Sequence, residues 1–223
     1  MTTTPPPRPR TRLYLITPPQ VADIPAFTSA LTAAIGAGDI ASLQLRLKGK
    51  DGLIDVDATR AVSRAVTGLA QEAGIAVLIN DSPELARELG ADGVHVGWDD
   101  VPVKTARSLL GPDAIIGATA KNSYHKAMQA GEDGADYVAF GAFYPTQTKE
   151  RTVPAELELL QVWQAAMLLP CVAIGGIRAS NAEPLVTAGA DFIAVSSGVW
   201  AHPEGPAEAV KAFNTLLDRL TPR

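Results

Sequence analysis

The chain has 223 residues, of which 47% are apolar, and one cysteine, so it can bury a full hydrophobic core but has no disulfide framework. Its 24 acidic residues outnumber its 19 basic residues, and the net charge of −5 argues against a general attraction to nucleic acid or to anionic membranes. No apolar run approaches the roughly eighteen residues of a membrane-spanning helix, and the N-terminus lacks a signal-peptide pattern, so we expect a cytoplasmic protein.

The first twelve residues, MTTTPPPRPRTR, are polar and rich in proline, which is typical of a disordered tail. No later segment resembles a linker between two domains. We therefore expect a tail over residues 1–12 and one folded domain over residues 13–223.

Short apolar runs typical of strands alternate with longer segments of helical spacing along this domain. We expect strands at Leu13–Thr17, Ser42–Arg46, Ala76–Asn80, Gly93–Val96, Ala114–Ala118, Tyr137–Gly141, Cys171–Gly175 and Phe192–Ser196. The expected helices include Val56–Ala73, Pro83–Leu89, Val103–Leu110, Ser123–Gly131, Ala155–Leu168 and Pro206–Leu220.

The expected strands are apolar on both faces, as in a parallel sheet that helices cover on each side. Several helices end in a glycine suited to a left-handed cap, and three of these ends continue as Gly-Ala-Asp into the next strand, at residues 90–92, 134–136 and 189–191. Eight such units predict an α/β fold of the (β/α)₈ barrel type, with a doubly wound open sheet as the alternative.

Carboxylates follow two neighbouring strands, Asp81 after the third and Asp100 shortly after the fourth. In a parallel barrel the ends of these strands share one rim, and paired carboxylates there suit Mg²⁺ bound together with substrate phosphate. The alternative for Asp81 is an N-cap of the following helix, because Ser82-Pro83-Glu84 comes next, and Asp100 has a similar alternative.

Cations accompany these acids at other strand ends. Gln44, Arg46 and Lys48 alternate along the second strand and so share one side, where the two cations could bind a diphosphate. A solvated strand end is the alternative. After the sixth strand, Thr146-Gln147-Thr148-Lys149 offers two hydroxyls and a third cation.

Small residues end the last two strands, at Gly175-Gly176 and Ser196-Ser197-Gly198. Loops at these positions of a (β/α)₈ barrel often bind phosphate through backbone amides, although tight turns alone would also explain the glycines. His95 fits a hydrogen-bonded core histidine better than a catalyst, and Trp98 could line a pocket or fill space.

Six motifs, in order, resemble the thiamine phosphate synthase family, whose superfamily also contains a thiazole tautomerase. The resemblance covers about residues 13–215, and its motifs are residues 13–17, Gln44-x-Arg46-x-Lys48, residues 79–81, residues 90–97, Tyr144-Pro145-Thr146-x-Thr148-Lys149 and residues 173–177.

The resemblance implies a (β/α)₈ barrel that forms a homodimer and joins a pyrimidine diphosphate to a thiazole phosphate, releasing pyrophosphate. It implies Mg²⁺ on Asp81 and Asp100, and a diphosphate surrounded by Arg46, Lys48, Asn80 and Lys149. It further implies Gln44 and Thr119 near the pyrimidine, and Thr146, Thr148 and the backbones of Gly176 and Ser197 near the thiazole phosphate.

The chain departs from the usual family pattern at Trp98, Ala118, Lys121 and Ala142, and the changes cluster near the expected pyrimidine side. Two other functions are therefore weighed against a transferase. A tautomerase-like isomerase would need a histidine after the fifth strand, where residues 120–123 contain none. A non-catalytic binder of thiamine-related phosphates would keep the pocket but lack Mg²⁺-dependent turnover.

Overall fold

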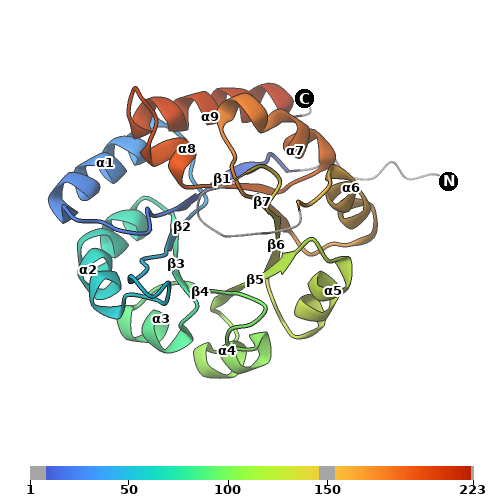
Figure 1. Cartoon of the computed structure of the whole chain (residues 1–223), viewed down its shortest axis with the longest axis horizontal. Helices are drawn as coiled ribbons and strands as arrows, with labels where there is room; N and C mark the ends of the chain where they lie inside the picture. Colours follow the sequence, from blue (N-terminus) through green and yellow to red (C-terminus); the bar gives the residue numbers. More distant parts are fainter. Residues whose placement is uncertain (1–8, 146–153, 222–223) are drawn as a thin grey trace.

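Eight parallel strands form a closed barrel in the computed structural model, which describes residues 9–145 and 154–221 (Figure 1). Each strand pairs with its sequence neighbours, and β1 also pairs with β8. The expected (β/α)₈ barrel is confirmed, and the open sheet is excluded. The strands are β1 Arg12–Ile16, β2 Ser42–Leu45, β3 Ala76–Asn80, β4 Gly93–Val96, β5 Ile115–Lys121, β6 Tyr137–Gly141, β7 Cys171–Ile174 and β8 Phe192–Val195.

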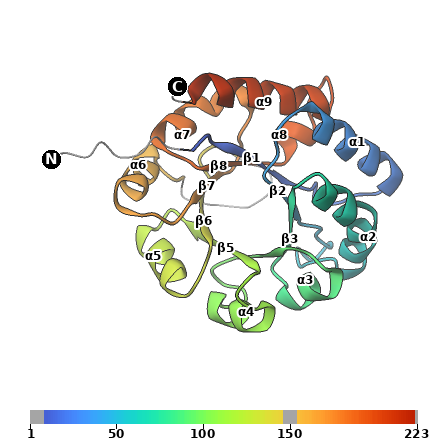
Figure 2. The ribbon, with the colours of Figure 1, turned by 180° about the vertical axis from the view of Figure 1, so that it is seen from behind.

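Helices surround the barrel on its outside (Figure 2). They are α1 Ile24–Ala37, α2 Val56–Glu72, α3 Pro83–Leu89, α4 Val103–Leu110, α5 Tyr124–Glu132, α6 Leu157–Ala166, the 3₁₀ turn η1 Ala179–Asn181, α7 Glu183–Ala188, α8 Ser197–Trp200 and α9 Pro206–Leu220. Within the described ranges, no helix is both long enough and apolar enough to cross a membrane.

Strand boundaries match the expectation closely, with two differences that bear on the site. β2 ends at Leu45, so Arg46 and Lys48 lie beyond the strand, and Lys48 instead forms an isolated bridge with Ile54. β5 continues to Lys121 and carries Thr119 within the strand. An irregularity in the pairing with β6, where Lys121 has a φ of +57°, accommodates the longer strand.

Alternate strand residues fill two separate cores. Leu13, Val77 and Val138 belong to the large core between the strands and the helices. Tyr14, Leu78, Tyr137 and Val172, with their inward neighbours, fill the inside of the barrel. The strands are therefore buried on both faces, which explains their uniformly apolar sequence.

The aspartates of the repeated Gly-Ala-Asp phrase join the strands in pairs at the end of the barrel where the strands begin. The Asp92 carboxylate accepts a hydrogen bond from the Val77 backbone N–H at 2.7 Å, while the Asp92 N–H donates to the Val77 carbonyl at 2.8 Å. Asp136 makes the same two bonds with Ile116, and Asp191 makes them with Cys171. Each aspartate thus ties an even-numbered strand to the strand before it.

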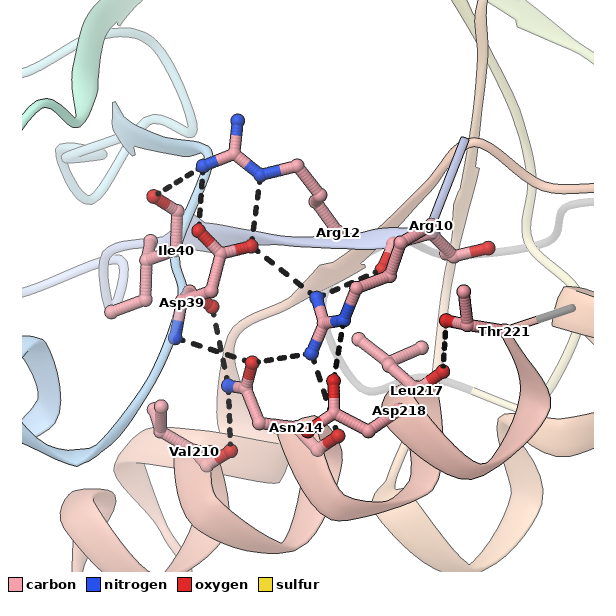
Figure 3. A network of polar contacts seen from close by, with 10 residues as sticks. Arg10, Arg12, Asp39, Ile40, Val210, Asn214, Leu217, Asp218 and Thr221 are labelled. Carbon is pink, nitrogen blue, oxygen red and sulfur yellow. Dashed lines mark hydrogen bonds and ion pairs between the residues drawn. The ribbon is translucent and has the colours of Figure 1, made fainter. Parts of the chain in front are cut away.

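Ion pairs of two arginines connect the start of β1 to the segment before β2 and to α9 (Figure 3). Arg12, the first residue of β1, binds the carboxylate of Asp39 through Nε at 2.8 Å and through Nη2 with a second bond. Arg10 contacts Asp39, Asn214 and Asp218, so it connects the start of β1 to α9. Arg12 also pairs with Phe192 of β8, so the same residue contacts β8 and the segment before β2.

We expect Asp39→Asn to destabilise the protein at neutral pH. Hydrogen bonds from Arg12 hold the pKa of the Asp39 carboxyl below its usual value. The ionised carboxylate therefore stabilises the folded state at pH values above the pKa of this aspartate in the unfolded chain, and the stabilisation is lost as pH falls through its lower pKa in the folded protein. Because the pair is partly exposed, we expect a loss of about 1 kcal/mol, or about 2–4 °C in the melting temperature. Thermal unfolding across pH measures this difference.

Asp218→Asn is the matched control, because Asp218 contacts Arg10 from a more exposed position on α9. It should shift the melting temperature less than Asp39→Asn does. A destabilisation by Asp39→Asn that persists unchanged at pH values well below about 3.9 would contradict the assigned role of its charge.

Candidate active site

Charged side chains from three neighbouring strand ends meet at one rim of the barrel. Lys48, beyond β2, places its Nζ 2.7 Å from the Asp81 carboxylate, and both side chains are largely buried. Asp81 directly follows β3 and has a φ of +64°, a conformation that is uncommon outside glycine. Its backbone N–H donates to the carbonyl of His95 on β4, which fixes this turn against the neighbouring strand.

The structure excludes the helix-cap alternative for Asp81. Ser82 is the N-cap of α3, and its hydroxyl accepts a hydrogen bond from the backbone N–H of Leu85. Pro102 occupies the corresponding position of α4 without a side-chain cap bond. Neither Asp81 nor Asp100 therefore occupies the N-cap position of the following helix.

Asp100 reaches back to the end of β4, where its carboxylate accepts a hydrogen bond from the Gly97 backbone N–H at 2.9 Å. A Cβ at position 97 would lie 2.3 Å from this oxygen, so glycine is required for the contact. Burial and then the nearby charge of Asp81 raise the pKa of the Asp100 carboxyl above its usual value. A side-chain hydrogen bond with Asp81 also contributes to this shift, so the two carboxylates lie close together.

This donor set suits a divalent cation that keeps some ligand positions for substrate. Two carboxylates from adjacent strand ends repel each other, and a bound Mg²⁺ would relieve that repulsion. Across residues 9–145 and 154–221, no group of three or more His, Cys, Asp or Glu side chains forms a more complete metal site. Phosphate oxygens and water would have to complete the coordination.

Arg46 is half-buried and close enough to Asp81 for the two charges to interact. Burial lowers the pKa of its guanidinium, while the charge of Asp81 opposes this shift, so Arg46 stays protonated at any ordinary pH. Its backbone N–H donates to the hydroxyl of Thr17 at the end of β1. A cation held in this partly desolvated place interacts strongly with an anion that reaches the rim.

Two buried amides lie on β2 and β3, inside the barrel. The Gln44 Nε2 donates to the Asn80 Oδ1 at 2.8 Å, which links β2 and β3 inside the barrel. The same interior holds Thr119, whose hydroxyl contacts the His95 Nε2 at 2.8 Å. Polar groups that the resemblance places around the pyrimidine therefore face a common interior.

Glycines after β7 bring two loops into close contact. Gly175 and Gly176 have φ angles of +107° and +64°, and a Cβ on Gly176 would lie 2.5 Å from the Pro145 carbonyl oxygen. Ser197 is the first residue of α8, so its backbone N–H has no acceptor within that helix. The binding of phosphate by these two backbones stays a prediction.

Three predicted site residues, Thr146, Thr148 and Lys149, lie outside the described residues. The remaining predicted residues, Gln44, Arg46, Lys48, Asn80, Asp81, Asp100 and Thr119, come from β2–β5 or from the segments directly after β2, β3 and β4. Gly176 and Ser197 come from the segments after β7 and β8.

Trp98 lies on the exposed side of the β4 loop. The Lys126 ammonium of α5 lies 4.5 Å from its ring centroid, and Asp99 forms an ion pair with Lys121 at 3.2 Å. Trp98 and Asp100 also line a small cavity of about 150 Å³ between this loop, α4 and α5. These contacts attach the loop that carries Asp100 to the next βα unit.

The sequence did not reveal two residues that support the site. Thr17 is buried, and it connects three strands by binding the Arg46 N–H, the Gln44 carbonyl and the Ser196 hydroxyl. Tyr137 contacts His95 from β6. The position of Thr17 at a strand end was a usable signal, whereas nothing local to Tyr137 indicates a polar partner inside the barrel.

These features define a (β/α)₈ enzyme whose rim combines two carboxylates with cations, an arrangement suited to phosphorylated substrates. The family model described as thiamine monophosphate synthase matches residues 13–199. The chain belongs to this family.

Relatives of this family are similar in sequence to the chain over nearly its full length. It is 76% identical over 220 residues to the thiamine-phosphate synthase of Hyphomonas neptunium, covering 99% of this chain and 100% of that protein. Identity to the Rhodospirillum centenum thiamine-phosphate synthase is 54%, covering 92% of this chain and 97% of that protein. The solved thiamine phosphate pyrophosphorylase from Pyrococcus furiosus superposes with a TM-score of 0.79 at 26% identity, covering 95% and 97% of the two chains.

We expect Asp100→Asn to stabilise the metal-free protein at neutral pH. The raised pKa means that ionising Asp100 disfavours the folded state, and this penalty appears as pH rises above the unfolded value of about 3.9. Asparagine can keep the bond from Gly97 without the charge. Since Asp100 is largely exposed, we expect a gain of at most about 1 kcal/mol, measured by thermal unfolding in a chelator.

Asp99→Asn serves as the control on the same loop, because Asp99 is exposed and pairs with Lys121 instead. It should give no gain in stability. The gain from Asp100→Asn should vanish at acidic pH, and a lower melting temperature than wild type at neutral pH would show that the carboxylates do not repel each other.

Proposed function

We propose that this chain catalyses the thiamine-phosphate synthase reaction as a Mg²⁺-dependent transferase. The reaction would join hydroxymethylpyrimidine diphosphate to a thiazole phosphate and release pyrophosphate. The observation that carries the proposal is the grouping of Lys48, Asp81 and Asp100 at one rim beside Arg46. The full-length identity of 76% to a relative that carries this name supports it.

The charges at the rim fit the demands of the first step. When the bond between the pyrimidine methylene carbon and the diphosphate breaks, negative charge builds on the departing oxygens. Arg46, Lys48 and Lys149 would bind these oxygens, with Asn80 beside them, and lower the barrier by electrostatic stabilisation. Asp81 and Asp100 would hold Mg²⁺, which supplies Lewis-acid charge to the same leaving group.

The second step needs alignment more than it needs a reactive side chain. The aminopyrimidine ring can delocalise the positive charge left on its methylene carbon, and the thiazole nitrogen then forms the new bond. Gln44 and Thr119 would orient the pyrimidine, while Thr146, Thr148, Gly176 and Ser197 would hold the thiazole phosphate. No covalent bond to the protein is required.

A tautomerase-like isomerase receives less support. The segment after β5 contains no histidine, and His125 is exposed on α5. A non-catalytic binder would also keep the ion pair of Lys48 and Asp81, so measuring turnover is what separates it from the synthase.

We further propose that the protein works in the cytoplasm as a homodimer. The sequence has one cysteine, Cys171, which is buried, so the chain cannot form an internal disulfide, and this suits a reducing compartment. Leu157 and Val162 of α6 and the fully exposed Leu168 after it supply apolar surface for a second copy. Sedimentation of wild type and Leu168→Asp tests the dimer, which should weaken in the variant.

Synthase activity and its dependence on Mg²⁺ test the main proposal. The purified protein should convert the two substrates to thiamine phosphate and pyrophosphate, and chelation of the metal should abolish turnover. Asp81→Ala and Lys149→Ala should each lower kcat by about a hundredfold or more, because each removes charge that stabilises the leaving group. Product formation is followed by chromatography and by a pyrophosphate assay.

Asp99→Ala is the matched control for Asp81→Ala, since it removes a rim carboxylate that pairs with Lys121 and not with Lys48. It should keep near-wild-type turnover. Turnover that survives both chelation and Asp81→Ala would refute the Mg²⁺-assisted mechanism, and binding without any turnover would favour the non-catalytic binder.

A further inference from the structure

Four side chains form a hydrogen-bonded chain through the inside of the barrel. The hydroxyls of Tyr14 on β1 and Tyr137 on β6 are 2.9 Å apart. The Tyr137 hydroxyl lies 2.8 Å from His95 Nδ1, and His95 Nε2 lies 2.8 Å from the Thr119 hydroxyl. This series of hydrogen bonds starts at Tyr14, which is 3% exposed, and ends at the half-buried Thr119 of β5.

The hydrogen atoms of such a chain can point in two directions. Each hydroxyl carries one hydrogen, and a neutral imidazole carries one on either nitrogen. Either Thr119 donates to His95 and the sequence of donors runs inward to Tyr14, or Tyr14 donates to Tyr137 and the sequence runs outward to Thr119.

The buried end of the chain decides between these directions. If the donors ran inward, the hydrogen on the Tyr14 hydroxyl would need another acceptor. Among the residues that the structure describes, Tyr137 is the only one whose side chain forms a hydrogen bond with the Tyr14 hydroxyl. A buried hydroxyl with an unsatisfied hydrogen is costly, so the inward direction is disfavoured.

A doubly protonated His95 meets the same obstacle. It would donate from both nitrogens, so the Tyr137 oxygen would accept and its hydrogen would turn to Tyr14. The Tyr14 hydrogen would again lack an acceptor. Burial raises the pKa of both tyrosines, so neither loses its hydrogen at ordinary pH to escape this conflict.

We propose that Tyr14, Tyr137 and His95 form a hydrogen-bonded chain of fixed outward direction that leaves the Thr119 hydroxyl hydrogen free to donate to a substrate. His95 then carries its hydrogen on Nε2, and the two tyrosines and His95 are positioning residues. With the proposed function as its basis, the inference assigns the free Thr119 hydrogen to a ring nitrogen of the pyrimidine, because that nitrogen accepts a hydrogen bond whereas the exocyclic amino group donates.

The tautomer of His95 can be observed without substrate. The protein has three histidines, and replacing the other two in a His125→Gln/His202→Gln variant leaves a single imidazole to observe. Nitrogen NMR of this variant, labelled at histidine, should show a protonated Nε2 and an unprotonated Nδ1. Protonation of Nδ1, alone or together with Nε2, would overturn the proposal.

Two tyrosine variants test which hydroxyl sets the direction. Tyr14→Phe leaves Tyr137 able to donate to His95, so the Nε2–H form should persist. Tyr137→Phe removes the donor to Nδ1, and the share of the Nε2–H form should fall. An Nε2–H form that is unchanged in Tyr137→Phe would show that Tyr137 does not set the direction.

Kinetics connect the tautomer to the substrate. Thr119→Val should raise KM for the pyrimidine diphosphate about fivefold or more, the effect of one lost hydrogen bond, while Thr119→Ser should stay near wild type. Tyr137→Phe should raise the same KM and leave KM for the thiazole phosphate unchanged. Equal effects on both substrates would contradict a positioning role toward the pyrimidine.

The two proposals fail in different ways. The Nε2–H form without any product formation would refute the synthase but keep the direction of the chain. Full synthase activity with protonated Nδ1 would refute the direction but keep the synthase.

Discussion

Closure of the parallel sheet is the constraint on which the rest of this structure depends. When eight strands run the same way around a barrel, every strand ends at one rim, and residues far apart in sequence become neighbours there. Lys48, Asp81 and Asp100 meet for this reason alone. Closure also buries both faces of each strand, so polar side chains inside the barrel must find partners in one another.

Polar and charged side chains find partners in different ways at the rim and inside the barrel. At the rim, Lys48 compensates Asp81 while Asp100 stays close to a second negative charge, so the charges are only partly balanced before a ligand binds. Inside, every buried side-chain nitrogen and oxygen of the described residues has a hydrogen-bond partner. Incompletely balanced charge therefore lies at the rim, and the hydrogen-bonded interior supports it rigidly.

The sequence was sufficient for the eight strands and for their order around the barrel. Buried strands are continuous apolar runs, and Asp81 or Arg46 stands out because a charge ends such a run. Three helices, α1, α7 and α8, were not among those expected, and the short α7 and α8 offer little periodicity to detect.

Contacts between distant strands could not be predicted in the same way. The choice between a cap and a ligand role for Asp81 depends on Ser82 taking the cap and on Lys48 reaching across from β2. The hydrogen-bonded series from Tyr14 to Thr119 joins side chains that are up to 123 positions apart in the sequence, and no local sequence pattern encodes it. Sequence indicates which residues are polar and buried, but only the closed barrel determines their partners.

The aspartates ahead of β4, β6 and β8 have a consequence for how the fold is divided. Each aspartate joins its strand to the strand before it, and a side-chain ion pair joins Arg12 of β1 to Asp39 ahead of β2, so polar contacts connect the strands in four pairs. Among the described residues, no aspartate joins the neighbouring strands of two different pairs in this way. A circular permutation that opens the chain between β2 and β3, or between β4 and β5, keeps the covalent connection within each pair, whereas an opening within a pair leaves only non-covalent bonds, those of the aspartate among them, to join the two strands.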